Sequence, residues 1–125
     1  MAVKEIYDMS ITLEAVDLPE SGLFELNVNQ IVDLKISADI ARRRVTRYVG
    51  DYIGDLLYAE KPTLVLQTKR AVWRVPVVLA TGKSGRLGQV GALDVDVETG
   101  ELDTREHLIE GIKTNAHRLV ARTTL

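Results

Sequence analysis

Three apolar runs separated by short turns constrain the fold of this chain more than any other feature of its sequence. They cover residues 63–68, 72–80 and 90–97. In the last run leucine and valine alternate with aspartate and glutamate, the period of two expected of a strand with one buried and one wet face. The connections are too short for the helical crossover that parallel neighbours need. The runs therefore predict an antiparallel meander and an α+β fold.

Two further strands are expected before residue 37. From Ile6 to Val16 apolar and polar residues alternate, which indicates a strand with one side in water. A turn that contains proline and glycine, at residues 18–22, then reverses the chain. The apolar residues from Leu23 to Ile36 stay in phase, which favours one long, bent strand; a break at residues 27–30 that makes two short strands is the alternative.

Two helices complete the expected element order, β-β-α-β-β-β-α. Ser37 is a good N-cap, and the helical period that follows predicts a long helix from Ser37 to Leu57 that ends before Pro62. A second helix should follow Asp103 and Glu106, which have capping-box spacing. The apolar stripes are Ala41, Val45, Tyr48, Val49, Tyr52, Ile53 and Leu56 in the first helix, and Leu108, Ile109, Ile112, Ala116, Leu119 and Val120 in the second. We expect the first stripe to cover the apolar face of the sheet, within a single domain of residues 1–125.

The composition is that of an ordinary globular domain, 46% apolar and 27% charged. The absence of cysteine excludes disulfides, thiolate metal sites and a cysteine nucleophile. A formal net charge of -2 makes nucleic acid or an anionic membrane an unlikely main partner. Because no signal peptide or apolar run of transmembrane length is present, we expect no membrane association and a cytoplasmic location.

Two fragments of ligand-binding motifs are incomplete. The Gly-Lys-Ser sequence at residues 82–84 has the ending of a phosphate-binding loop, but Val77 occupies the position of the first glycine. Residues 94–98 begin like a calcium loop, but Thr99 stands where that motif needs glycine. The two histidines lie ten residues apart on one predicted helix and point in different directions. We therefore expect no cofactor, no metal site and no catalytic residues.

Arg42, Arg43 and Arg47 belong to the strongest local cluster of charge. One interpretation is a solvated helix face with an ion pair between Arg47 and Asp51. The other is a recognition patch for an acidic partner or an anion.

Three residues indicate an interface. Gly50 and Gly54 lie four apart on the first helix, and each costs up to about 1 kcal/mol relative to alanine. Close approach of the second helix or of a second subunit would explain that cost. Pro76 cannot donate to a sheet ladder, so its strand is expected to be an edge or to carry a bulge there. An exposed edge would invite pairing with another chain.

The run from the first helix to the third apolar run resembles the PepSY domain, a small α/β module similar in shape to half of a cystatin-like fold. The resemblance covers about residues 40–102. It is carried by the helix ending near Leu57, by Val72-Trp73-Arg74-Val75-Pro76-Val77, and by Leu-Asp-Val-Asp-Val-Glu-Thr-Gly-Glu at residues 93–101. Members of that family are usually exported or membrane-attached and are thought to act by binding, including inhibition of peptidases. The resemblance implies a binding module with no catalytic residues.

The favoured function is therefore a non-enzymatic interaction or regulatory module, either a homo-oligomer or a binder of another protein. The alternative is a small-ligand-binding protein or an enzyme with a pocket between the long helix and the sheet. That pocket would lie near Tyr48, Tyr52, Trp73 and Arg74. Nucleic-acid binding through the arginines is a third possibility.

Overall fold

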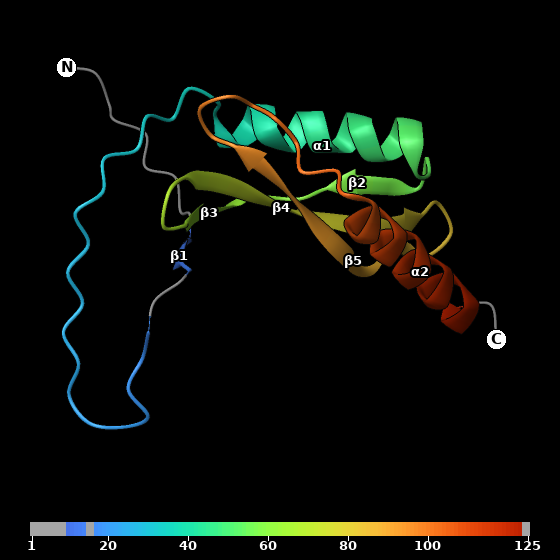
Figure 1. The fold of residues 1–125 in the computed structure, drawn as a ribbon. Helices are drawn as coiled ribbons and strands as arrows, with labels where there is room; N and C mark the ends of the chain where they lie inside the picture. The colour runs from blue at the N-terminus through green and yellow to red at the C-terminus, as the bar shows by residue number, and fades with distance from the viewer. Residues whose placement is uncertain (1–9, 15–16, 124–125) are drawn as a thin grey trace, which may run out of the picture.

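The structure is a computed structural model that describes residues 10–14 and 17–123. It has an α+β fold with two helices and a five-stranded mixed sheet. The elements are β1 (Ile11–Leu13), α1 (Ala38–Tyr52), β2 (Leu57–Ala59), β3 (Thr63–Leu66), β4 (Ala71–Thr81), β5 (Gly85–Asp96) and α2 (Glu106–Thr123). Figure 1 shows α1 lying along the sheet and a long loop before α1 that stands away from the body.

The central strand is β4. It pairs antiparallel with β5 on one side, and on the other side with β3 and β2 in turn. The antiparallel meander predicted for residues 63–97 is thereby confirmed. The prediction of a wholly antiparallel sheet is wrong, because β1 runs parallel to β3. The chain between those two strands contains α1, which supplies the long crossover that parallel strands require.

Pro76 lies in the interior of the sheet, so the prediction that its strand is an edge is wrong. On one side β4 pairs with β3 through residues 71–74 and with β2 through residues 77–79, and Pro76 falls between the two. Its carbonyl accepts a hydrogen bond from the N–H of Glu60 at 3.0 Å. The missing N–H therefore faces the break between two partner strands, where no ladder bond is lost. The predicted irregularity occurs beside it, as a register shift between Val77 and Val78 against β5.

The first helix begins as predicted and ends early. The Ser37 side chain accepts a hydrogen bond from the N–H of Ile40 at 3.1 Å, which confirms the N-cap. The helix stops at Tyr52, where the N–H groups of Ile53 and Gly54 both reach the carbonyl of Val49. Residues 57–59, the first of which was expected to end the helix, form β2 on β4 instead.

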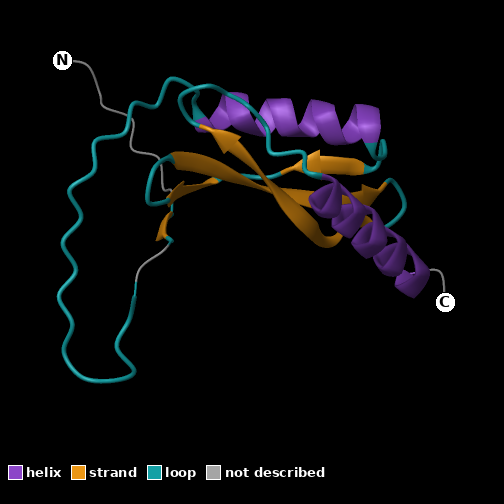
Figure 2. Ribbon diagram, viewed as in Figure 1, coloured by secondary structure: helices purple, strands orange, loops and turns teal. Residues whose placement is uncertain are grey.

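The expected second strand is absent from the described residues. Residues 23–36 form an extended loop, drawn in teal in Figure 2, and Leu23 and Ile31 are fully exposed at 103% and 101%. The period of two is present in the sequence, but a strand also needs a neighbour to share its hydrogen bonds. In this segment only Ile36 makes hydrogen bonds to a distant part of the described chain, with Val97 and Trp73. Of the first expected strand, Ile11–Leu13 is found, whereas residues 6–9 and 15–16 lie outside the described residues.

The core lies between α1 and one face of β4. Val45 and Val49 are wholly buried against a β4 face that carries Trp73, Val75 and Val77. Ile112 of α2 completes this cluster, and the rest of its predicted stripe is partly buried apart from the more exposed Val120. The predicted stripe of α1 is confirmed in its first turns but not at its end: the exposed side chains there are Tyr52 and Leu56. Leu56 lies beyond the early end of the helix, whereas Tyr52 is its last residue.

Close approach occurs at a glycine that the sequence did not single out. A Cβ atom at Gly91 of β5 would lie 2.6 Å from Cγ1 of Ile112, so α2 packs directly on the backbone there. At Gly50 no atom lies within 4 Å of such a Cβ, and at Gly54 only the Leu57 side chain does, at 4.0 Å. Among the described residues these two glycines have no close neighbour, so their role at a subunit interface stays a prediction.

Gly91→Ala and Gly50→Ala should move stability in opposite directions. The first forces Ile112 away from β5 and should lower the free energy of unfolding by about 1–3 kcal/mol. The second replaces a helical glycine that has open space and should raise it by about 0.5–1 kcal/mol. Urea unfolding of both variants at low protein concentration measures this difference. Equal shifts would contradict the packing of α2 described above.

Candidate functional site

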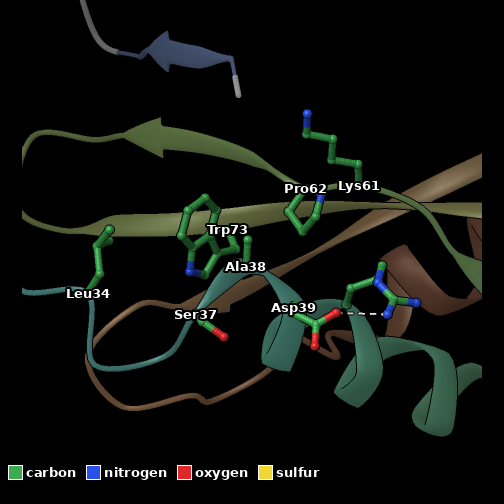
Figure 3. A pocket seen from close by; sticks show the side chains of 8 residues that line it. Leu34, Ser37, Ala38, Asp39, Lys61, Pro62 and Trp73 are labelled. Atoms are coloured by element: carbon green, nitrogen blue, oxygen red, sulfur yellow. Dashed lines mark hydrogen bonds and ion pairs between the residues drawn. The ribbon is translucent and has the colours of Figure 1, made fainter. Parts of the chain in front are cut away.

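An open groove lies where α1 begins, on the face of the sheet that α1 covers (Figure 3). Its volume is about 920 Å³. The helix starts close to Trp73, as Figure 3 shows, and does not extend over the sheet beyond it. Its lining comes from the loop before α1, the first turns of α1, the β2–β3 connection and β4: Leu34, Ser37, Ala38, Asp39, Arg42, Lys61, Pro62 and Trp73. We call this the α1 groove.

Trp73 fixes one wall of the α1 groove. Its indole Nε1 donates to the carbonyl of Ile36 at 2.7 Å, so the ring is held against the chain just before α1. The residue is only 3% exposed and belongs to the buried core. Leu34 and Pro62 flank it in Figure 3 and extend an apolar surface on both sides.

The polar part of the lining is mainly cationic. Asp39 accepts a hydrogen bond from Arg42 at 2.8 Å and forms an ion pair with Arg43 at 2.9 Å. The hydrogen bond from Arg42 is the main cause that holds the pKa of the Asp39 carboxyl below its usual value. Lys61 is exposed at the rim. Such a lining suits a ligand that combines apolar side chains with carboxylates.

The four residues predicted to surround a pocket do not come together. Trp73 lines the α1 groove, whereas Tyr48 and Tyr52 contact each other farther along α1, with ring centroids 4.9 Å apart. Arg74 lies on the opposite face of β4, because neighbouring residues of a strand point to opposite sides. The prediction grouped these residues because Trp73 and Arg74 are consecutive in the chain, and because Tyr48 and Tyr52 lie four residues apart on the helix.

Arg74 instead joins three strands on that opposite face. Its guanidinium donates to both carboxylate oxygens of Asp94 on β5 at 2.9 Å, and to Glu14 at 2.9 Å, just after β1. Gln67 adds a hydrogen bond to Glu14 at 2.9 Å. Arg74 and, to a smaller extent, Gln67 donate hydrogen bonds to the Glu14 carboxylate and so lower its pKa. The hydrogen bonds that Arg74 donates to Asp94 and, to a smaller extent, to Glu14 raise the pKa of its guanidinium. This cluster holds the end of β1 to the sheet.

The arginines of the predicted patch have acidic neighbours on their own helix. Arg42 and Arg43 share Asp39, and Arg47 lies 4.0 Å from Asp51, the ion pair expected of a solvated face. These exposed pairs offset part of the local positive charge. Recognition of an acidic partner by this patch stays a prediction.

Several groove residues were not singled out from the sequence. Leu34 was assigned to a strand and Pro62 only to a helix stop, and both positions depend on where α1 starts relative to Trp73. No local pattern encodes that distance. The contact between Arg74 and Asp94 had a usable signal, since they are direct cross-strand partners in the predicted meander.

Comparison of the chain with protein-family models, with curated proteins and with solved structures found no match. Neither helix of the described chain is long and apolar enough to cross a membrane. In residues 10–14 and 17–123, histidine, aspartate and glutamate form no group of three that could hold a metal ion.

The Glu14 contacts should make stability depend on pH. Because the folded-state pKa of Glu14 is lowered, its contribution is present above the ordinary glutamate pKa and is lost as the pH falls through the folded value. Glu14→Gln should therefore lower stability at neutral pH and reduce the loss of stability on acidification. Urea unfolding at neutral and acidic pH tests this, with the exposed Glu20→Gln as a control. If both variants keep the full pH dependence of the parent, the cluster does not stabilise the fold.

Proposed function

We propose that this chain is a small, non-enzymatic interaction module that works by self-association in the cytoplasm. The observation that carries this proposal is the placement of exposed apolar side chains. Of the twelve large apolar side chains that are exposed in the described residues, seven lie between residues 17 and 34. They are Leu18, Leu23, Phe24, Leu26, Val28, Ile31 and Leu34.

Such a concentration favours burial against a partner. Full burial of one of these side chains is worth about 1.5–3 kcal/mol, and contiguous exposed apolar surface marks interaction sites in folded proteins. The segment also has an extended backbone, which can pair with a sheet edge of another chain. Both properties support binding rather than chemistry.

A second copy is the partner that the chain itself supports best. The same molecule carries an exposed apolar segment and an apolar groove, and complementary surfaces on one chain favour homo-oligomers. A regulatory role and the peptidase binding implied by the PepSY resemblance stay predictions.

Self-association should appear as a concentration-dependent mass. Sedimentation velocity of the full chain from about 1 μM to about 100 μM should show a shift from one chain toward a dimer, as expected for micromolar affinity. The same shift should persist at high salt, because apolar burial drives it. The mass of a single chain at every concentration would overturn the proposed function.

Small-ligand binding in the α1 groove is the second candidate. The groove volume falls in the range of ligand sites, about 300–1,000 Å³, and Leu34, which is 48% exposed, offers apolar surface beside the buried Trp73.

Carboxylic acids with an aromatic or alkyl tail should raise the melting temperature by a few degrees if this candidate is correct. Lys61→Gln should reduce the shift because it removes a cation from the groove rim, while Lys83→Gln on the exposed β4–β5 turn should not. Thermal unfolding across such a panel gives the measurement. A flat response, or equal shifts in both lysine variants, would exclude binding of these acids in the groove.

A further inference from the structure

We propose that two copies of this chain exchange arms. The arm is residues 17–31, and it lies in the α1 groove and along the β1 edge of the other copy, which returns its own arm in the same way. This inference rests on the proposed function, since it specifies how self-association occurs.

The arm is a strand without a ladder. Phe24, Leu26 and Val28 occupy alternate positions and are exposed at 51%, 51% and 48%. Among the described residues, the arm makes no hydrogen bond to any other part of the chain. The chain that follows the arm is fixed to the body of the protein, because the N–H of Ile36 donates to the carbonyl of Val97 at 2.9 Å. Between the two ends the arm runs out from the body of the protein (Figure 1).

The acceptor surface has a free edge and an apolar face. β1 pairs with β3, and no described strand pairs with its other side. Ile11 of β1 is in register with Leu64, which is in register with Trp73, so the three side chains share the face that forms the α1 groove. Ile11 is 63% exposed. The groove therefore continues as an apolar strip to the unpaired edge.

Charge favours the arm as the occupant of this strip. Between residues 17 and 36 the chain has four acidic residues, Asp17, Glu20, Glu25 and Asp33, and a single basic one, Lys35. The groove contributes Arg42 and Lys61 against Asp39, to which Arg42 is already bonded, so Lys61 carries its net positive charge. An acidic, apolar strand thus meets an apolar groove with a net charge of +1, and both are present on every copy.

The area is sufficient for a stable dimer. If each of the six exposed apolar side chains of the arm buries on the order of 70 Å² and covers as much again, two arms remove about 1,700 Å² from water, and a standard interface needs about 1,200–2,000 Å².

An arm that fills its own groove is disfavoured by the course of the chain. Leu34 already lines the groove of its own copy, and the chain runs outward from there. The turn at residues 18–22 lies at the far end of the arm from Leu34. To fill the same groove the arm would have to double back a second time next to Leu34, and residues 23–36 contain neither glycine nor proline to make that turn. Exchange with a second copy requires no such reversal.

Two matched variants test the role of the arm. Leu26→Asp with Val28→Asp places two charges on the apolar side of the arm, and Asn27→Asp with Asn29→Asp places two charges on its other side. The first pair should weaken dimerisation at least about 100-fold, because both arms lose buried side chains, and the second should leave it within a few-fold. Sedimentation velocity gives the dissociation constants. Circular dichroism should show an unchanged fold, since these side chains are exposed in a single copy.

A mixing experiment tests the exchange itself. Ile11→Asp with Lys61→Glu damages the groove side and should also abolish the homodimer. When this groove variant is mixed with the Leu26→Asp, Val28→Asp arm variant, one intact arm meets one intact groove, so a heterodimer should form with weaker affinity than the parent. Native mass spectrometry with one isotope-labelled partner detects it.

The outcomes separate this inference from the proposed function. If the arm variant dimerises as tightly as its control, the chain self-associates by another surface and arm exchange is wrong. If the mixture yields no heterodimer, the arm does not enter the groove of a second copy. If the parent chain is monomeric throughout, both proposals fail together.

Discussion

The fold depends on β4, whose two faces and two edges are all used. One edge pairs with β5 and the other with β3 and β2, so that three strands take their position from it. Its Trp73 face is sealed by the valines of α1, and burial of this kind is the main favourable term in folding. The hydrogen bond from the Trp73 indole to Ile36 then holds the start of α1 next to this residue of β4, and the α1 groove lies at that position.

The two faces of β4 differ in chemical character. The face under α1 is apolar and ends in the groove, whereas the opposite face holds Arg74 between Glu14 and Asp94. Bidentate pairs of this type fix geometry more than they add free energy at partly exposed sites. Here they secure β1, a strand of three residues that has no other described neighbour except β3. The polar face thus maintains the edge beside which the apolar groove lies.

Local patterns in the sequence predicted the elements whose partners are close in the chain. The meander, the Ser37 cap and the buried positions of α1 follow from periodicity and capping, and the structure confirms them. The same periodicity failed for residues 23–36, because alternation describes a side-chain pattern and does not supply a neighbouring strand. Pro76 was misplaced for a related reason. A missing N–H is compatible with an edge or with a gap between two partners, and only the topology distinguishes them.

The gap between β2 and β3 lies where the sheet meets the α1 groove. Residues Glu60 to Pro62 connect two short strands at the point where β4 offers no N–H, and two of them, Lys61 and Pro62, also line the groove. Insertions or deletions at this junction would reshape the groove and put at risk a single hydrogen bond of the sheet, the one from the N–H of Glu60 to the carbonyl of Pro76. The groove can therefore change shape here at little cost to folding.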